Sequence, residues 1–468
     1  MAGPENEPQP RVAHLVQVGD IIVTDVPRID LESYISNYKG RTRTNRLLLI
    51  ASTSTVLVVD ALKLAIQEVK ENKFDVQQYR HLTEELRALD STQPEAVFDR
   101  HWADTVDKTN QQELIRLETE LKGYKNNLIK ESIRMGNEDL AKHLENTGEL
   151  AQAYEVYAKM RSDVSSTKHI AEVGLHLARI SIYRRDWSMA IANVNKISSL
   201  HVDAEDKSFG ALCGILLGIG QLGQAKYKDA TQSFLQVAAT LDPTLYHEFA
   251  SPNDIATYGG LLALATMTRP ELDRFLDASP FRTFLELEPH LRRAITQFVN
   301  GRYSVCLTIL ESYRSDYLLD LYLQPHVHHL YSLIRAKCIR HFLQPFSCVT
   351  IDSMNAAFAS PGASIEAELV EMIRHGGLQA RIDSIEKLVT TANVKPRAKM
   401  QNASLTAART YEKDAISRIR RIGIISADLE VKGKQRGHLG FDALDGSYGS
   451  SRFEPDKDDS ASFADSLA

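Results

Sequence analysis

Long apolar runs are missing from this sequence of 468 residues. The longest nearly apolar stretch, 211–220, is about half as long as the roughly 20 residues that a membrane-spanning helix needs. The segment 1–10 is polar and rich in proline, unlike the apolar core of a secretory signal peptide. We therefore expect a protein of the cytoplasm and nucleus that has no membrane partner.

Cysteine is scarce as well. The chain has four cysteines, and no two of them form the C-x-x-C pair that is typical of zinc sites and redox motifs. They are Cys213, Cys306, Cys338 and Cys348. The sequence therefore predicts neither a disulfide framework nor a structural zinc site.

An excess of positive charge is also absent. Lysine and arginine together number 55, against 61 aspartates and glutamates, which gives a net charge of −6. A chain of this kind has no overall attraction to phosphate backbones. Neither DNA nor RNA is therefore the expected partner.

The sequence signatures of catalysis are missing too. The phosphate-binding motifs GxxxxGK[ST] and GxGxxG and the nucleophile motif GxSxG do not occur. The one candidate metal cluster is His326, His328 and His329, but the first two would point about 200° apart on a helix. A metalloprotease of the JAMM type would also need serine and aspartate where Ala336 and Ile339 stand. We predict no catalytic residue, no metal site and no cofactor, and hence no enzyme.

What the chain does contain is a repeated pair of small residues. Each pair has a spacing of twelve positions, and the pairs are Ala141/Ala153, Ala178/Ala190, Gly218/Ala230 and Ala294/Cys306. Their second members are 37, 40 and 76 residues apart, the last interval being two steps of 38 across a degenerate copy at Ala256/Thr268. Gly148 and Asp186 are expected to turn the first two hairpins.

Large residues flank the second member of each pair at fixed distances. Three positions before it stand Leu150, Trp187, Tyr227 and Tyr303, and four positions after it stand Tyr157, Val194, Phe234 and Leu310. Small residues let two antiparallel helices touch, and large ones fill the groove to the next hairpin. The pattern predicts tetratricopeptide-like helical repeats over 111–330.

The stretch ahead of the repeats is also predicted to be helical. Apolar residues recur at helical spacing over 30–89, 90–94 is a polar loop, and a helix is expected again from Ala103. Because 1–27 is polar and rich in proline, we expect disorder there and an N-terminal helical region over 28–110.

A different pattern begins after Pro345. The predicted elements are helices over 331–342, 351–358 and 364–375 and strands over 378–383 and 385–390. Ser364 is a good N-cap for the third helix. This is the order of a winged helix, which we place at 331–391. A helical array that runs into a winged helix is typical of the PCI domain, expected here over about 250–391.

The third helix of the predicted winged helix is too acidic to bind DNA. It carries Glu366, Glu368 and Glu371 against Arg374 alone, so it would repel the phosphates beside a major groove. The edge of the wing, by contrast, offers unpaired backbone groups to a neighbouring strand. We predict a partner-binding edge formed by Gln379, Ala380, Arg381 and Ile382.

One long helix is predicted over 397–431. Its apolar heptad positions are Leu405, Ala408, Ala415, Ile419, Ile422 and Leu429. We predict that these residues bind partner helices in a bundle, and the alternative that the helix folds back on its own winged helix stays open. Residues 432–468 are expected to form a disordered acidic tail. The fold class predicted for the whole chain is mainly α: a tetratricopeptide-like α-solenoid, a winged helix and a long C-terminal helix.

Six stretches carry a resemblance to a known family. They are 29–40, 59–65, 121–134, 251–266, 284–289 and 318–323. The run from Tyr258 to Thr266, Tyr-Gly-Gly-Leu-Leu-Ala-Leu-Ala-Thr, is the most specific of them. On these residues the chain resembles the subunit 1 family of the COP9 signalosome, which are PCI proteins, and more distantly the corresponding subunit, Rpn7, of the 26S proteasome lid.

That resemblance implies a non-catalytic scaffold. The signalosome removes a ubiquitin-like modifier from the cullins of cullin-RING ubiquitin ligases, and its catalytic metal sits in a different subunit. The resemblance also implies a winged helix beside those of subunits 2 and 3, a C-terminal helix in a bundle shared by all subunits, and cullin-RING ligases as indirect partners. The alternatives are the equivalent proteasome-lid subunit and an RNA-associated PCI protein.

Overall fold

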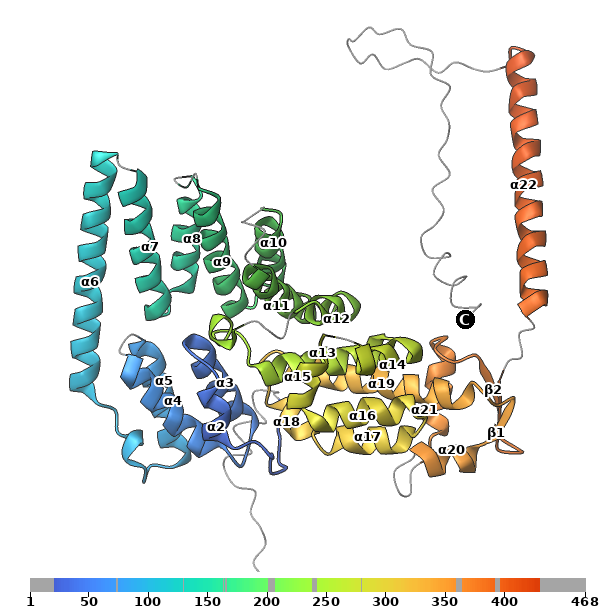
Figure 1. Ribbon diagram of the computed structural model, residues 1–468, viewed down its shortest axis with the longest axis horizontal. Helices are drawn as coiled ribbons and strands as arrows, with labels where there is room; N and C mark the ends of the chain where they lie inside the picture. The colour runs from blue at the N-terminus through green and yellow to red at the C-terminus, as the bar shows by residue number, and fades with distance from the viewer. Residues whose placement is uncertain are drawn as a thin grey trace, which may run out of the picture. The chain divides into compact units, whose positions relative to one another are not determined.

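The computed structural model describes residues 21–72, 75–128, 130–162, 164, 166–200, 207–237, 242–278, 280–358, 364–391 and 396–429 (Figure 1). These residues are mostly helical and contain one three-stranded sheet, so the predicted mainly-α fold is confirmed. The chain divides into two compact units, Met1–Ala392 and Asn393–Ala468. The disorder predicted for 1–20 and for 432–468 falls outside the described residues.

The N-terminal boundary of the fold lies earlier than predicted. Val23 donates its backbone N–H to the carbonyl oxygen of Thr53 at 2.9 Å and accepts from the N–H of Thr55 at 3.1 Å. Its side chain is buried in the core of the N-terminal helices. The expected disorder of 1–27 is therefore wrong at Val23, because one apolar side chain and two backbone hydrogen bonds hold this segment.

Four helices form the N-terminal region. They are α2 (Leu31–Ser36), α3 (Arg41–Thr53), α4 (Val58–Asn72) and α5 (Val76–Leu89), in agreement with the helical spacing of 30–89. The predicted loop leads to a short 3-10 helix, η1 (Pro94–Ala96), and Asp99 then caps α6 (Arg100–Asn127) by accepting from the N–H of Trp102 at 3.0 Å. The core of this region also includes Leu319, from far along the chain.

Helical hairpins occupy the four predicted repeats. They are α7 (Lys130–Thr147) with α8 (Leu150–Met160), α9 (Thr167–Tyr183) with α10 (Trp187–Ser198), α11 (Lys207–Gly223) with α12 (Tyr227–Leu235), and α16 (Pro289–Val299) with α17 (Tyr303–Glu311). The small residues of every pair are buried. A Cβ at Gly218 would lie 2.8 Å from the ring of Phe234, too close for any side chain. The helical repeats predicted from small residues are confirmed.

All four hairpins use the same turn. A residue with positive φ stands five positions before the second small residue, and these residues are Gly148, Arg185, Ala225 and Gly301. The next residue then donates its N–H to a carbonyl five positions back, as Asp186 does to Ser181 at 2.9 Å. Asp186 was predicted to turn the second hairpin, and this is wrong. It is the N-cap of α10, where its carboxylate accepts from the N–H of Met189 at 3.2 Å.

The degenerate repeat departs from the hairpin pattern. After η2 (Pro243–Leu245), α13 (Pro252–Thr266) packs against the preceding helix α12 and against α15 (Arg282–Leu287), α16 and α19 (Gln324–Leu343), rather than forming a hairpin with α14 (Arg269–Ala278). A Cβ at Gly259 would lie 2.3 Å from the ring of Phe281, and one at Gly260 would lie 2.3 Å from Leu291. Two adjacent glycines therefore let α13 approach its neighbours closely, and Thr268 lies just outside α14.

The winged helix follows α18 (Arg314–Leu318). Its elements are α19, β1 (Cys348–Thr350), α20 (Ile351–Phe358), α21 (Glu366–Arg374), β2 (Ala380–Asp383) and β3 (Leu388–Thr391). The strands are antiparallel in the order β1-β3-β2. Helix α20 has the predicted bounds, whereas α19 begins in the repeat region and runs through the predicted boundary at 331 without a break.

Three details of the winged helix differ from the prediction. Strand β1 was not expected, because three residues are too few to show an alternation. Ile385 lies in the turn and not in the returning strand, and Asp383 holds that turn by accepting from the N–H of Ile385 at 3.0 Å. The N-cap of α21 is Ile365 rather than Ser364, whose hydroxyl accepts from the N–H of Glu366 at 3.3 Å.

The C-terminal unit contributes α22 (Pro396–Ser426). The helix ends before the predicted position, 431, because Asp428 takes a positive φ of 56° and the N–H of Leu429 donates to the carbonyl oxygen of Ile424 at 3.1 Å. Leu429 therefore follows the helix. In the part of the chain that the structure describes, no helix combines the length and the hydropathy needed to cross a membrane.

Candidate functional site

The predicted wing edge lies on and just before β2. Within the described residues this strand pairs with β3 alone, so its other edge carries no strand. Gln379 and Arg381 are exposed, Ala380 is buried and Ile382 is half-buried, as expected for a strand with one covered face. An edge of this kind can accept a strand from another chain, so a partner-binding role stays a prediction for these residues.

The acidic residues of α21 partly serve the winged helix itself. Glu368 forms an ion pair with Arg335 of α19 at 2.8 Å, and Glu366 accepts from the hydroxyl of Ser384 in the wing turn at 3.1 Å. Glu371 lies 4.0 Å from His375 at the end of the same helix. The carboxylates thus position α21 against α19 and the wing, and they keep the helix acidic.

Helix α22 carries the other predicted site residues except Leu429, which follows the helix. Their side chains are Leu405 (51% exposed), Ile419 (68%), Ile422 (65%) and Leu429 (71%), with Ala408 exposed and Ala415 half-buried. Tyr411 and Ile416, which the heptad frame omits, fall with the helical members in an arc of about 140° at ~100° per residue. The helix presents a broad apolar stripe, and a stripe of this kind normally packs against other helices.

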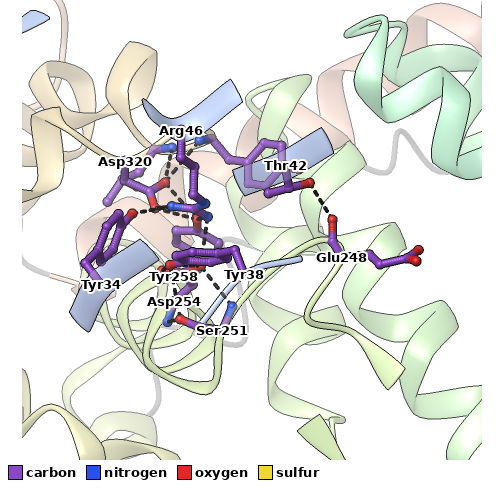
Figure 2. Close-up of polar contacts among 11 residues, drawn as sticks. Tyr34, Tyr38, Thr42, Arg46, Glu248, Ser251, Asp254, Tyr258 and Asp320 are labelled. Atoms are coloured by element: carbon purple, nitrogen blue, oxygen red, sulfur yellow. Dashed lines mark hydrogen bonds and ion pairs between the residues drawn. The ribbon is translucent and has the colours of Figure 1, made fainter. Parts of the chain in front are cut away.

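A buried charge cluster that the sequence analysis missed lies where α3 meets α13 and the segment before α19 (Figure 2). Arg46 of α3 is completely buried. Its Nη2 donates to Asp254 Oδ2 at 2.7 Å, and its Nη1 donates to Asp320 Oδ2 at 2.7 Å. We call Arg46, Asp254 and Asp320, together with Tyr34, Tyr38 and Tyr258, the Arg46 node.

The tyrosines complete the hydrogen bonding of the Arg46 node. Tyr38 donates its hydroxyl to Asp254 at 2.8 Å, Tyr258 donates to Asp320 at 2.7 Å, and the hydroxyl of Tyr34 accepts from Arg46. The guanidinium carbon of Arg46 also lies 4.1 Å from the centroid of the Tyr38 ring. Every acid and every tyrosine of the node is therefore bonded to another member, as Figure 2 shows.

Asp254 also caps the start of helix α13. Asp254 accepts from the N–H of Ser251 at 3.0 Å, and the hydroxyl of Ser251 accepts from the N–H of Asp254 at 3.1 Å. This capping box satisfies two donors at the N-terminus of α13. Asp254 thus links the start of α13 to the N-terminal helices.

Burial opposes charge in the Arg46 node. Burial acts to lower the pKa of Arg46. The attraction of Asp254 and of the other acidic neighbours outweighs this effect and raises the pKa of Arg46 well above its usual value. Burial raises the pKa of Asp254, against the attraction of Arg46. One protonated guanidinium therefore serves two carboxylates that are out of water, and its loss would leave both without compensation.

A second set of ion pairs joins the N-terminal helices to the repeats. Arg179 of α9 pairs with Glu145 at 3.0 Å and with Glu248 at 2.9 Å, while Arg41 of α3 donates to the carbonyl oxygen of Glu145 at 3.0 Å and pairs with Asp75 at 3.3 Å. These side chains line a cavity of about 360 Å³. Because both arginines already have acidic partners, the cavity is a structural junction rather than an anion site, and we call these five side chains the Arg179 junction.

The three candidate histidines, for which no metal site was predicted, do not share one environment. His326 is buried, and its Nδ1 lies 3.2 Å from the hydroxyl of Tyr227, whereas His328 and His329 are exposed. Across the described ranges, no group of three histidine, cysteine, aspartate or glutamate side chains is placed to hold a metal ion. All four cysteines are free.

Part of the Arg46 node had a sequence signal. Tyr34, Tyr38, Asp254, Tyr258 and Asp320 lie inside the stretches 29–40, 251–266 and 318–323, on which the family resemblance rests. Arg46 lies outside those stretches, and its partners are 208 and 274 residues away. No local pattern connects such positions.

Two family descriptions match the chain. Residues 99–274, from the end of the N-terminal region to α14, match the family "26S proteasome subunit RPN7". Residues 310–392, which include α18, α19 and the whole wing, match "PCI domain". The second match agrees with the winged helix at the end of the helical repeats.

Curated relatives match over most of their length and of this chain. COP9 signalosome complex subunit 1 of Neurospora crassa is 48% identical over 400 residues, which is 85% of this chain and 91% of that protein. The proteins of the same name from Emericella nidulans and Arabidopsis thaliana are 42% and 33% identical and cover 88% and 87% of this chain, or 84% and 92% of their own lengths. Since relatives that are 33–48% identical each cover more than four fifths of this chain, the chain belongs to the COP9 signalosome complex subunit 1 family.

Proposed function

We propose that this chain is a non-catalytic scaffold subunit of a COP9 signalosome, which supports the removal of a ubiquitin-like modifier from cullin-RING ubiquitin ligases. The observation that carries this function is the 48% identity over 85% of the chain with a protein named as subunit 1 of that complex. The chain would act in the cytoplasm and nucleus, with the cullin-RING ligases as indirect partners.

Two surfaces of the chain are suited to assembly. The unpaired edge of β2 can be extended by the wing of a neighbouring PCI subunit, for which subunits 2 and 3 are the candidates. The apolar stripe of α22 leaves isoleucine side chains exposed on a helix with few apolar partners of its own. Packing of that stripe into a bundle with helices from the other subunits would bury it.

The experiment is purification of the tagged chain from its native cells, followed by identification of what co-purifies. Recovery of cullins together with a metalloprotease subunit and other PCI subunits supports the signalosome role. A preparation that contains none of these proteins contradicts it. The matched control keeps the wing edge and α22 intact and changes Lys168 and Lys228, which are exposed on repeat helices, and it should recover the same partners.

A proteasome-lid subunit is the second candidate. It is favoured by the match of residues 99–274 to the 26S proteasome subunit RPN7 family. Recovery of proteasome ATPases without cullins in the same purification would select this candidate over the signalosome.

A further inference from the structure

Three arginines that form no ion pair within the described residues lie on neighbouring elements of the N-terminal unit. Arg269 begins α14, Arg302 caps α17, and Arg340 lies in the last turn of α19. All three are exposed, and none forms an ion pair with any residue that the structure describes. We call these three side chains, with Lys337 and His341 beneath them, the Arg269 patch.

Direct contacts hold the elements of the Arg269 patch together. The Nε of Arg269 donates to the carbonyl oxygen of Val299 at 2.8 Å, in the turn that continues to Arg302. Below that turn, the ring of Phe298 lies 5.4 Å from His341 and 5.5 Å from Tyr303. The patch thus combines α14, the α16–α17 turn and α19, which are neighbours in Figure 1.

A buried lysine adds to the positive charge of the patch. Lys337 donates from its Nζ to the carbonyl oxygen of Leu264 at 2.6 Å and to that of Met267, so it caps the C-terminus of α13. Its Nζ lies 4.9 Å from the centroid of the Phe298 ring. Lys337 is therefore a structural group whose charge lies under the exposed arginines.

The pKa of His341 also indicates an excess of positive charge in the patch. Burial lowers the pKa of His341, and Lys337, Arg269 and Arg340 lower it further. The nearby carboxylate of Glu271 is already used, since it accepts from the N–H of Thr268 at 2.7 Å. Asp273, four positions after Arg269 on α14, forms no ion pair within the described residues. Within the described ranges, the three arginines of the patch therefore have no ion-pair partner.

We infer that the Arg269 patch is a docking surface for an acidic peptide segment of a partner protein. Arginine guanidinium groups present paired donors that match carboxylates, and three of them on three elements can contact successive acidic side chains of an extended peptide. None of its residues belongs to the β2 edge or to α22, so it would act in addition to assembly through them.

Nucleic acid fits the Arg269 patch less well. Proteins that bind single strands add exposed aromatic rings on which bases stack. Here the two aromatic rings, Phe298 and Tyr303, are buried. The net charge of −6 also gives the chain no general attraction to phosphate backbones.

The test measures binding of a short fluorescein-labelled peptide of alternating glutamate and glycine to the full-length chain by fluorescence anisotropy. The triple variant R269E/R302E/R340E should weaken binding by about tenfold or more, since it replaces attraction by repulsion at three contacts. The matched control, R87E/K168E/K228E, reverses three exposed cations on other helices and should change binding less than about twofold. Binding of the peptide should also weaken as salt is raised.

Two outcomes would overturn the inference. One is a peptide that fails to bind, or that binds both triple variants alike. The other concerns an oligodeoxythymidine of equal charge. If it binds the wild type more tightly than the peptide does, and if this binding is lost in the R269E/R302E/R340E variant, the patch would be assigned to nucleic acid. Circular dichroism and thermal unfolding check that each variant folds, and R269Q/R302Q/R340Q, which removes charge without repulsion, should give an intermediate loss.

Discussion

The Arg46 node and helix α22 both depart from the usual rule that charged side chains are exposed and apolar side chains are buried. The node buries an arginine and two aspartates completely or almost so, whereas α22 exposes Ile419 and Ile422. Charged residues are rarely buried unless they are paired, and isoleucine is among the residues most often inside. Each region therefore needs a partner: the node finds it within the chain, and α22 has the composition of a helix that finds it outside.

This difference separates what holds the chain together from what makes it a subunit. The node and the Arg179 junction attach the N-terminal helices to segments more than 100 residues away, so the N-terminal region is part of the same unit as the winged helix. The stripe of α22 has no comparable contacts among the described residues of its own unit, where its side chains are mostly exposed. Substitutions in the two regions should therefore act on different quantities, stability in one and assembly in the other.

The largest effect on stability is expected from Arg46→Met. This change leaves Asp254 and Asp320 buried without their cation, and breaking a buried ion pair in this way costs about 3–5 kcal/mol. Thermal or urea unfolding of the isolated chain measures the loss. Arg409→Met, at an exposed position of α22, is the matched control and should cost less than about 0.5 kcal/mol.

A variant that also neutralises the acids sharpens this result. R46M/D254N/D320N should be more stable than R46M alone, because the uncompensated negative charges are gone. Equal stability of R46M and the wild type would mean that the node carries no net energy, and the contrast with α22 would fail.

The next effect in size is expected from a glycine substitution made in both regions. A Cβ at Gly259 would lie 2.3 Å from the ring of Phe281, so Gly259→Ala should cost about 1–3 kcal/mol through overpacking. A Cβ at Gly423 of α22 would meet no other part of the described structure within 4 Å. Gly423→Ala should therefore not destabilise the chain, and it should raise helicity slightly, since alanine favours a helix by about 1 kcal/mol over glycine. Unfolding midpoints and far-UV circular dichroism test the pair.

A pH-dependent effect is expected beside the Arg179 junction. Burial, and then the charge of Arg179, lower the pKa of His176 from 6.5 to about 4. The unfolded chain thus binds a proton at His176 more tightly than the folded chain does. The contribution of neutral His176 to the stability of the fold is therefore complete above pH 6.5, and it is lost as the pH falls towards 4. At pH 5 the loss should be about 2 kcal/mol.

His176→Gln is the variant that isolates this contribution. It keeps a polar side chain but cannot take up a proton, so its stability should fall less than that of the wild type between pH 7 and pH 5. Unfolding midpoints at the two pH values give the comparison. The same fall in both proteins would assign the acid sensitivity to other groups.

The sequence predicted the local features of the fold and missed the distant ones. The hairpins were predictable because Ala178 and Ala190, or Gly218 and Phe234, meet across a turn of a few residues. The Arg46 node was not, because an arginine on an amphipathic helix looks solvated until a partner 274 residues away covers it. Short elements failed for another reason: three residues of β1 show no periodicity, and the positive φ of Asp428 left no sign in the heptad pattern that predicted α22 to 431.

The predicted binding residues show the same division. The alternation of Leu378, Ala380 and Ile382 is local, so the edge position of β2 followed from the order of elements once the wing was recognised. The heptad frame found the centre of the α22 stripe but not Tyr411 or Ile416, because a frame of strict period 3.5 omits residues at the margins of a broader stripe.

The smallest effect on the isolated chain, and the largest on assembly, is expected from Ile419→Asp with Ile422→Asp. Both side chains are mostly exposed, so two carboxylates in their place should change the stability of the isolated chain by less than about 0.5 kcal/mol. If the stripe is buried among partner helices, the same carboxylates would be desolvated without partners, and incorporation into the complex should fall by at least about tenfold.

The matched control is Thr410→Asp with Ser417→Asp, on the opposite face of α22. Co-expression with the other subunits, followed by size-exclusion chromatography, compares the two double variants with the wild type. Equal incorporation of both would show that the stripe is not an assembly surface, while equal loss of both would mean that added charge anywhere on α22 is enough to block assembly.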